Sequence, residues 1–172
     1  LWQSLNADNR NPLFNRVVLG LYPPASTWKL AVAGIGLDLG VITPDEKMPV
    51  ACTGSYTFGD RSYRCWDPDG HGFNNLAEAI GNSCDVYFYQ LGLRIGLDPL
   101  LRRSTEIGFS RQCGIDLPQE SRGIFPSERE FWEQRFGYAP REGEVLPLSI
   151  GQGPNSQTPL KIAQFYLALA RD

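Results

Sequence analysis

Hydrophobic residues recur at three- to four-residue spacing along much of this chain, and the pattern predicts a mostly helical protein. The clearest stripe lies between Ser26 and about Leu39, where Gly40 and Pro44 end it, and consists of Trp28, Val32, Ile35 and Leu39. Breaking residues bound the other expected helices, which cover 76–80, 86–93, 98–107, the segment up to about 136, and a last helix that starts at 158–159. We expect the last helix to bury Ile162, Phe165, Tyr166 and Leu169.

Polar residues that commonly cap helices precede several of these segments. Asn75 precedes the helix at 76–80, and Asp85 precedes the helix at 86–93. Ser127 and Glu130 have the spacing of a capping box. These residues predict where the helices begin.

The pattern predicts few strands. Residues 48–67 hold Thr, Tyr, Phe and Val around Gly59-Asp60, which predicts a hairpin or a long loop. The apolar run 146–150 is a candidate short strand, and residues 1–25 read as irregular. The expected fold class is therefore mostly α with few short strands.

Composition narrows the class of protein. A chain of 172 residues with 42% hydrophobic residues is one domain or a large piece of one. Its net charge of -3 leaves no basic stripe, so we expect no nucleic-acid partner. No apolar run has the length of a membrane span, and no segment reads as a signal peptide. Both ends resemble the interior of a domain, so we expect a fragment of a larger protein.

The candidate chemistry begins with Ser26 and Lys29, which lie three residues apart after two prolines. On a helix this spacing puts both side chains on one face. A lysine in a partly dry site can take the proton of the serine, which then carries an acyl group. The competing interpretation is a helix-capping Ser26 followed by a solvated Lys29. His71 is the single histidine, so a Ser-His-Asp triad is possible but not favoured.

A set of motifs then resembles the class B penicillin-binding proteins, most nearly their penicillin-binding protein 2 branch. The resemblance runs from about Leu13 to the C-terminus. It rests on Tyr22-Pro23-Pro24-Ala25-Ser26-Thr27-Trp28-Lys29, Arg64-Cys65-Trp66, Gly70-His71-Gly72, Asn82-Ser83-Cys84-Asp85-Val86-Tyr87-Phe88-Tyr89-Gln90, Gly114-Ile115-Asp116-Leu117-Pro118, and Leu148-Ser149-Ile150-Gly151-Gln152-Gly153 with Gln157-Thr158-Pro159-Leu160.

Three departures from the family pattern matter. Ala25 replaces a glycine of the first motif, and Asp85 replaces the usual asparagine of the second. The Lys-Thr/Ser-Gly triplet of the family is not found in this sequence. The resemblance therefore implies a partial transpeptidase domain at 1–172, without the N-terminal anchor, the pedestal and the C-terminal sheet strands. The implied architecture is the helical lobe of the α/β penicillin-binding or serine transpeptidase fold, left incomplete.

The resemblance also implies roles for residues of this chain. Ser26 would be the nucleophile, Lys29 its base, Ser83 a proton relay and Asp85 the residue that holds the network. Gly151, Gln152 and Gly153 would either contact substrate or form a tight turn behind the site. The Ser26 N–H would form half of the oxyanion hole. Catalysis needs no cofactor.

The implied partners are peptidoglycan stem peptides that end in D-Ala-D-Ala, β-lactams, and membrane proteins of the elongation complex. The implied location is the periplasmic face of the bacterial inner membrane. Without the missing triplet, we expect the isolated segment to be acylated slowly or not at all.

Three of the four cysteines and the single histidine form a second candidate site. Cys52, Cys65, His71 and Cys84 would form a Cys₃His set of the kind that binds structural zinc, although their spacing is irregular. The alternatives are a disulfide between Cys52 and Cys65, or buried thiols. Two other functions remain open: a serine β-lactamase or its sensor relative, and a non-catalytic, zinc-stabilised interaction module.

Overall fold

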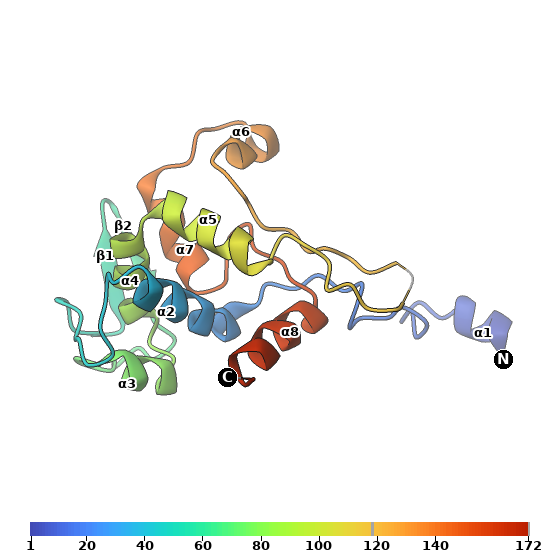
Figure 1. The fold of residues 1–172 in the computed structure, drawn as a ribbon, viewed down its shortest axis with the longest axis horizontal. Coiled ribbons are helices and arrows are strands. Elements are labelled where there is room, and N and C mark those ends of the chain that lie inside the picture. Colours follow the sequence, from blue (N-terminus) through green and yellow to red (C-terminus); the bar gives the residue numbers. More distant parts are fainter. Residues whose placement is uncertain (118, 172) are drawn as a thin grey trace.

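The computed structural model describes residues 1–117 and 119–171 (Figure 1). Two residues named in the sequence interpretation lie outside the described residues. They are Pro118, which closes the segment that begins at Gly114, and Asp172, the last residue of the predicted domain.

The prediction of a mostly helical chain with few strands is confirmed. The helical elements are α1 (Trp2–Asn6), η1 (Ala25–Trp28), α2 (Lys29–Asp38), α3 (Leu76–Gly81), α4 (Asp85–Ile95), α5 (Leu97–Ile107), α6 (Glu130–Phe136), η2 (Glu142–Glu144), α7 (Val145–Ser149) and α8 (Pro159–Leu169). In the described part of the chain, the strands are β1 (Ser55–Phe58) and β2 (Arg61–Arg64).

Helix α4 is the centre of the core. α2, α5 and α7 pack around it (Figure 1), and its buried residues extend around the helix rather than along one stripe. Its three aromatic residues, Tyr87, Phe88 and Tyr89, are all buried, as the sequence predicts. A helix with apolar residues on most of its surface has to lie inside the protein, and this accounts for the central position of α4.

The predicted hairpin at 48–67 is confirmed. β1 and β2 pair antiparallel, with Ser55 opposite Arg64 and Phe58 opposite Arg61, around the turn at Gly59-Asp60. The Tyr89 hydroxyl of α4 donates to the Arg64 carbonyl oxygen at 3.0 Å. This bond fastens the hairpin to the core helix.

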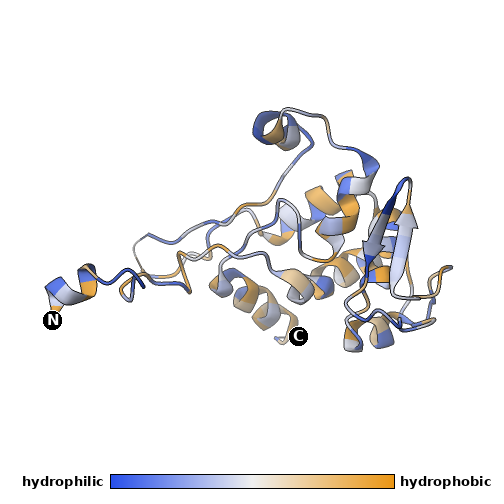
Figure 2. Cartoon of the chain, turned by 180° about the vertical axis from the view of Figure 1, so that it is seen from behind, coloured by the Kyte–Doolittle hydropathy of each residue, from blue (hydrophilic) through white to orange (hydrophobic). Residues whose placement is uncertain are grey.

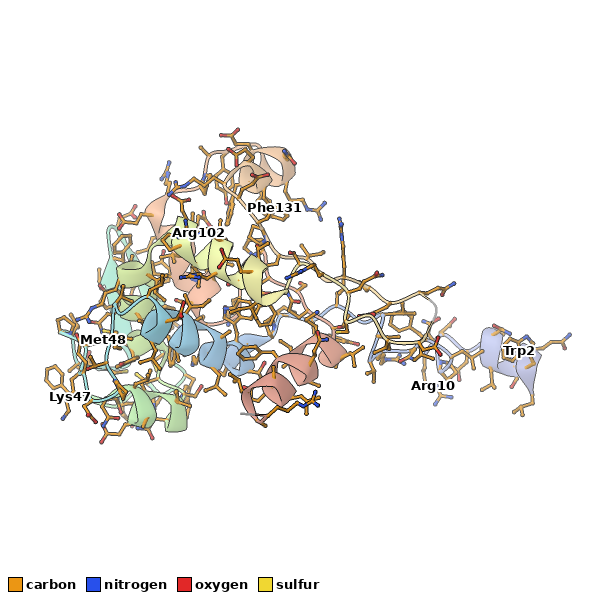
Figure 3. All side chains as sticks on the ribbon, in the orientation of Figure 1. Trp2, Arg10, Lys47, Met48, Arg102 and Phe131 are labelled. Carbon is orange, nitrogen blue, oxygen red and sulfur yellow. The ribbon has the colours of Figure 1, made fainter. Side chains whose placement is uncertain are left out.

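The N-terminal segment extends away from the helical body. Figure 3 labels Trp2 and Arg10 along this arm, far from Lys47 and Met48 at the opposite end. The expectation that 1–25 is irregular is wrong at α1, a five-residue helix with no buried residue. Closer to the body, backbone bonds join the arm to later segments: Ser121 N–H donates to Val18 O at 2.9 Å, and Tyr22 forms a bridge with Gln157.

The candidate strand at 146–150 is wrong, because this segment forms most of α7. Its side chains at 145, 146 and 148 are fully buried against α4 and neighbouring elements. A short apolar run fits a buried helix as well as a buried strand, so only packing distinguishes the two.

Two of the predicted helix starts are confirmed by their caps, and one is wrong. Asn75 forms a complete capping box with Glu78, and the Thr158 hydroxyl accepts from the Lys161 N–H, so both of these helix starts are confirmed. The predicted Ser127 box is wrong, since α6 begins only at Glu130 without a side-chain cap.

Helix α8 has the predicted start but not the predicted burial. Ile162 and Phe165 are only partly buried against the core, while Tyr166 and Leu169 are 36% and 50% exposed. Figure 2 shows the hydrophobic colouring of this helix. None of the helices in residues 1–117 and 119–171 combines the length and apolarity needed to cross a bilayer.

Candidate active site

Ser26 and Lys29 lie at the junction between η1 and α2. Ser26 is exposed in the short 3₁₀ segment, whereas Lys29 is the first residue of α2 and is only 2% exposed. The side chain of Ser26 does not cap a helix, and Lys29 is not solvated. The interpretation as a cap followed by a surface lysine is therefore wrong.

The second motif forms the turn between α3 and α4. Ser83 has a φ of 50°, a left-handed conformation that residues other than glycine rarely adopt. Asp85 begins α4 and is buried. This turn brings residues that lie 54 to 57 positions from Ser26 and Lys29 next to them.

The Lys29 amine is the hub of the site. Its Nζ donates to Asp85 Oδ1 at 2.7 Å, to Ser83 O at 2.7 Å and to Ser83 Oγ at 2.9 Å. Ser26 Oγ lies 3.3 Å from Nζ, and the Ser83 hydroxyl donates to Ser26 Oγ at 2.8 Å. The three short contacts match the three protons of an ammonium. The four side chains predicted as catalytic thus form one connected hydrogen-bond network.

Asp85 binds in a different way from the cap that the sequence predicts. Its Oδ1 pairs with Lys29, and its Oδ2 accepts from the Trp66 backbone N–H at 3.1 Å. Both carboxylate oxygens are therefore occupied by long-range partners, and Cys84 takes the capping position without a side-chain bond. The buried charge of Lys29 has a counter-charge in this ion pair.

The turn after α7 packs against Ala25, the residue directly before the serine. The Ala25 N–H donates to Gly151 O at 3.0 Å, and a Cβ at Gly151 would lie 2.3 Å from Ala25 O. Gly151, with φ of 73°, therefore has the tight-turn role that the sequence analysis left open. Gln152 and Gly153 are exposed beside it, and their contact with substrate stays a prediction.

Ala25 itself has a φ of 49°. The left-handed region carries little cost for glycine and a cost for alanine. This conformation gives a physical reason for the glycine that the family pattern places at this position. The departure at Ala25 thus stores backbone strain directly before the nucleophile.

The four candidate metal ligands converge. The ligand atoms of Cys52, Cys65, His71 and Cys84 all lie within 4.8 Å of one another. His71 Nδ1 lies 3.7 Å from Cys52 Sγ and 3.6 Å from Cys65 Sγ. A tetrahedral zinc ion with bonds of about 2.3 Å to sulfur and about 2.0–2.1 Å to nitrogen separates its ligand atoms by about 3.5–3.8 Å. The donor set and its spacing fit zinc.

Protonation of this cluster depends on its surroundings. Burial raises the pKa of the Cys84 thiol to about 12 and also raises the pKa of Cys65. All four cysteines of the chain are free. On the opposite side of the imidazole, His71 Nε2 lies 3.8 Å from Asp67 Oδ2, which is too far for a hydrogen bond.

The sequence analysis assigned no role to three residues beside the site, although one of them, Asn82, begins the second motif. The Asn82 side-chain N–H donates to Asn74 Oδ1 at 3.0 Å, and the Trp66 indole N–H donates to Asn82 O at 2.9 Å. Trp66 belongs to a motif that carries the family resemblance, but the motif does not reveal this contact. An amide pair eight positions apart leaves no recognisable periodic signal.

Comparisons with known proteins agree with this geometry. The family model for the penicillin binding protein transpeptidase domain matches residues 3–172. The peptidoglycan D,D-transpeptidase MrdA of Acinetobacter baumannii is 38% identical over 94% of this chain and 24% of that protein. The MrdA of Escherichia coli is 34% identical over 99% of this chain and 27% of that protein. The chain thus spans about a quarter of the curated relatives' length.

Solved structures show the same arrangement of the chain. Pseudomonas aeruginosa PBP2, crystallised in complex with WCK 5153, superposes with a TM-score of 0.91 at 39% identity, over 98% of this chain and 38% of that one. Helicobacter pylori PBP2 superposes with a TM-score of 0.90 at 38% identity, over 99% of this chain and 32% of that one. The expected helix-rich part of the transpeptidase fold is confirmed. The chain belongs to the penicillin-binding protein transpeptidase family and is similar to its penicillin-binding protein 2 members.

Proposed function

We propose that this chain supplies the serine, lysine and second-motif residues of a peptidoglycan D,D-transpeptidase that works through an acyl-serine intermediate. The observation that carries the proposal is the connected network of Ser26, Lys29, Ser83 and Asp85, with all its contacts between 2.7 and 3.3 Å. Curated relatives at 34–38% identity are named D,D-transpeptidases, which favours this activity over a β-lactamase or a non-catalytic module.

In the first half-reaction, Ser26 Oγ attacks the carbonyl carbon between the two D-alanines of a stem peptide. A new Oγ–C bond forms, and the amide C–N bond to the terminal D-Ala breaks. Once the Lys29 ammonium has released one of its protons to solvent, Nζ takes the Ser26 proton, directly over 3.3 Å or through the Ser83 hydroxyl that contacts both groups. Ser83 then delivers a proton to the departing amine, while Asp85 holds Lys29 in place.

In the second half-reaction, an amine of a neighbouring stem peptide attacks the acyl-ester. A new amide bond forms, the ester C–O bond breaks, and Ser26 regains its proton. A β-lactam enters the same path, but its amine stays tethered after ring opening, so the adduct on Ser26 persists. The Ser26 N–H supplies one of the donors that stabilise the oxyanion. No step requires a cofactor.

We place the whole protein at the periplasmic face of the inner membrane, where stem peptides are cross-linked. Its proposed partners are membrane proteins of the cell-elongation machinery. This proposal is supported by a solved complex of Helicobacter pylori PBP2 with MreC and by a solved peptidoglycan synthase complex, both of which superpose on this chain.

A labelled penicillin tests the nucleophile in the full-length protein. We expect a stable adduct, and peptide mass mapping should place it on Ser26. Ser26→Ala should remove labelling, while Ser4→Ala, at an exposed serine in the N-terminal arm, should leave it unchanged. Labelling that survives Ser26→Ala would exclude this serine as the nucleophile.

We further propose that Cys52, Cys65, His71 and Cys84 hold a structural zinc ion. Support comes from the convergence of four donors within 4.8 Å and from the burial that keeps the thiols protonated unless a cation binds them. A disulfide between Cys52 and Cys65 would leave Cys84 and His71 without a reason to converge there. The ion would join the segment before the hairpin to the start of α4, and its role would be structural.

Elemental analysis tests the metal. Protein purified without added metal should contain about one equivalent of zinc per chain, as expected for one Cys₃His site. His71→Ala and Cys52→Ser should each lose it, whereas Cys113→Ser should retain it, because Cys113 lies outside the cluster. Absence of zinc together with two fewer free thiols than cysteines would overturn the proposal and support the disulfide.

A further inference from the structure

The turn at Ser83 has to be held from outside. Its left-handed φ of 50° is unfavourable for serine, and such a conformation persists only when the surrounding contacts impose it. The turn also positions two of the acceptors of Lys29, because Ser83 O and Ser83 Oγ both accept from Nζ. A small rotation of this peptide would therefore move both atoms away from the lysine.

Asn82, the residue before Ser83, is held at both of its polar ends. Its side-chain N–H donates to Asn74 Oδ1 at 3.0 Å, and its backbone carbonyl accepts from the Trp66 indole at 2.9 Å. Asn74 is only 5% exposed, although it is an uncharged polar residue in a loop. Its own amide donates to His71 O at 3.3 Å and has a longer contact of 3.5 Å with Gly72 O. Asn82 is thereby connected to the loop that carries His71.

Trp66 has an unusual balance of contacts for a tryptophan. Its side chain is 64% exposed, so burial does not account for its position. Its indole N–H reaches Asn82 O, while its backbone N–H reaches Asp85 Oδ2 at 3.1 Å. One residue thus contacts both sides of Ser83.

We propose that Asn74 and Trp66 are positioning residues for acylation, which act through Asn82 to hold Ser83 in its left-handed conformation. This inference rests on the proposed function. It assigns roles to residues that, among the described hydrogen bonds, bind neither Ser26 nor Lys29, and it connects the state of the His71 loop to the geometry of the lysine hub.

The chain supplies a matched control for the test. Asn75 is adjacent to Asn74 but serves a different purpose: its side chain caps α3 by accepting from the Glu78 N–H at 2.9 Å. Asn75→Ala should lower the melting temperature without altering the Ser83 turn, which lies at the other end of α3. Asn74→Leu keeps the approximate size of the side chain. It removes both the oxygen that accepts from Asn82 and the amide N–H that donates to His71 O.

The measurement is stopped-flow acylation of the full-length protein by a fluorescent penicillin, with the limiting rate and the half-saturating concentration determined separately. Asn74→Leu should lower the limiting rate by about threefold to tenfold, the effect of one lost hydrogen bond. Trp66→Phe removes the indole N–H that binds Asn82 O and retains the backbone N–H that binds Asp85. We therefore expect it to lower the limiting rate by a factor in the same range. The half-saturating concentration should change by less than about twofold, because ground-state binding is kept.

A double-mutant cycle separates positioning from general loosening. Asn82→Ala and Asn74→Leu should slow acylation no more together than singly, because they break the same contact. An unchanged limiting rate in Asn74→Leu would overturn the proposal, as would equal slowing by Asn75→Ala at an equal loss of melting temperature. If the unsubstituted protein is not labelled at all, the proposed function fails instead, so the two failures are distinguishable.

Discussion

At the scale of single residues, two of the four described non-glycine residues with a positive φ belong to the candidate site. Ala25 and Ser83 both have positive φ values, 49° and 50°, and both lie within hydrogen-bonding networks that hold them there. Strain of this kind persists where the surrounding structure imposes it, and functional sites are the usual place. Ala25 and Ser83 differ from the other two, Asn11 and Gln119, in lying directly at the candidate nucleophile and its proposed proton relay.

Replacing Ala25 by glycine should stabilise the protein. Glycine adopts a positive φ without the steric cost paid by alanine, although it also gains entropy in the unfolded chain. We expect Ala25→Gly to raise the free energy of unfolding by about 0.5–1 kcal/mol, measured by urea denaturation. Ala77→Gly in the exposed face of α3 should do the opposite and cost about 1 kcal/mol. A loss of stability in Ala25→Gly would contradict the strain at this position.

The ion pair of Lys29 and Asp85 gives a second prediction at this scale. Removing one partner of a buried pair leaves the other charge uncompensated, so Asp85→Leu should lower the free energy of unfolding by about 3–5 kcal/mol. Asp85→Asn keeps an acceptor oxygen for Lys29 and should cost less. Equal losses in the two variants, measured by urea denaturation, would show that charge pairing is not what holds Lys29.

At the scale of elements, the position of η1 depends on the turn that follows α7. Gly151 packs against the backbone of Ala25 and against Trp28 Cβ, which a Cβ at Gly151 would approach to 2.7 Å. α7 in turn packs on α4, the helix that begins with Asp85. The two halves of the hydrogen-bond network are therefore joined through the core and not only through Lys29.

Gly151→Ala should disrupt this junction. A Cβ would meet Ala25 O at 2.3 Å, so η1 has to move, and we expect a loss of about 2–4 kcal/mol in unfolding free energy together with slower labelling of Ser26. Gly137→Ala, directly after α6, is the matched control, since its φ of 77° carries the same strain while no atom lies within 4 Å of the added Cβ. It should cost only about 1–2 kcal/mol. Similar labelling rates in the two variants would contradict the packing role of Gly151.

At the scale of the whole molecule, the Cys₃His cluster brings together the segment before the hairpin, the segment after it and the start of α4. The loops around the hairpin contain many glycines and exposed residues, so the proposed metal cross-link would add stability to them. Cys84 lies between Ser83 and Asp85, so this cross-link would lie directly beside the proposed catalytic network.

Removal of the metal should therefore affect both stability and acylation. We expect a chelator to lower the melting temperature of the full-length protein by at least about 5 °C, as the loss of a few kcal/mol would for a domain of this size, and to slow penicillin labelling. Cys113→Ser should respond to the chelator as the unsubstituted protein does. His71→Ala should already be destabilised and should not respond further. A response to reductant but not to chelator would point to a disulfide.

The sequence by itself determined those features that depend on neighbouring residues. The cap at Asn75, the start of α8 at Thr158 and the hairpin turn at Gly59-Asp60 were all predictable, because each depends on contacts within a few positions. The spacing of Ser26 and Lys29 likewise placed both on one side of a helical turn. The motifs, taken in order, also identified the family.

Only the tertiary structure decided the features that depend on distant partners. The segment 146–150 became helix α7 because it packs against α4, and Asp85 became the counter-charge of Lys29 rather than a cap because Lys29 is buried beside it. The convergence of Cys52 with Cys84 and the contact of Asn74 with Asn82 also arise from the folded path of the chain. The local sequence limits which conformations a segment can adopt. The residues that the segment contacts are decided by the packing of the whole core.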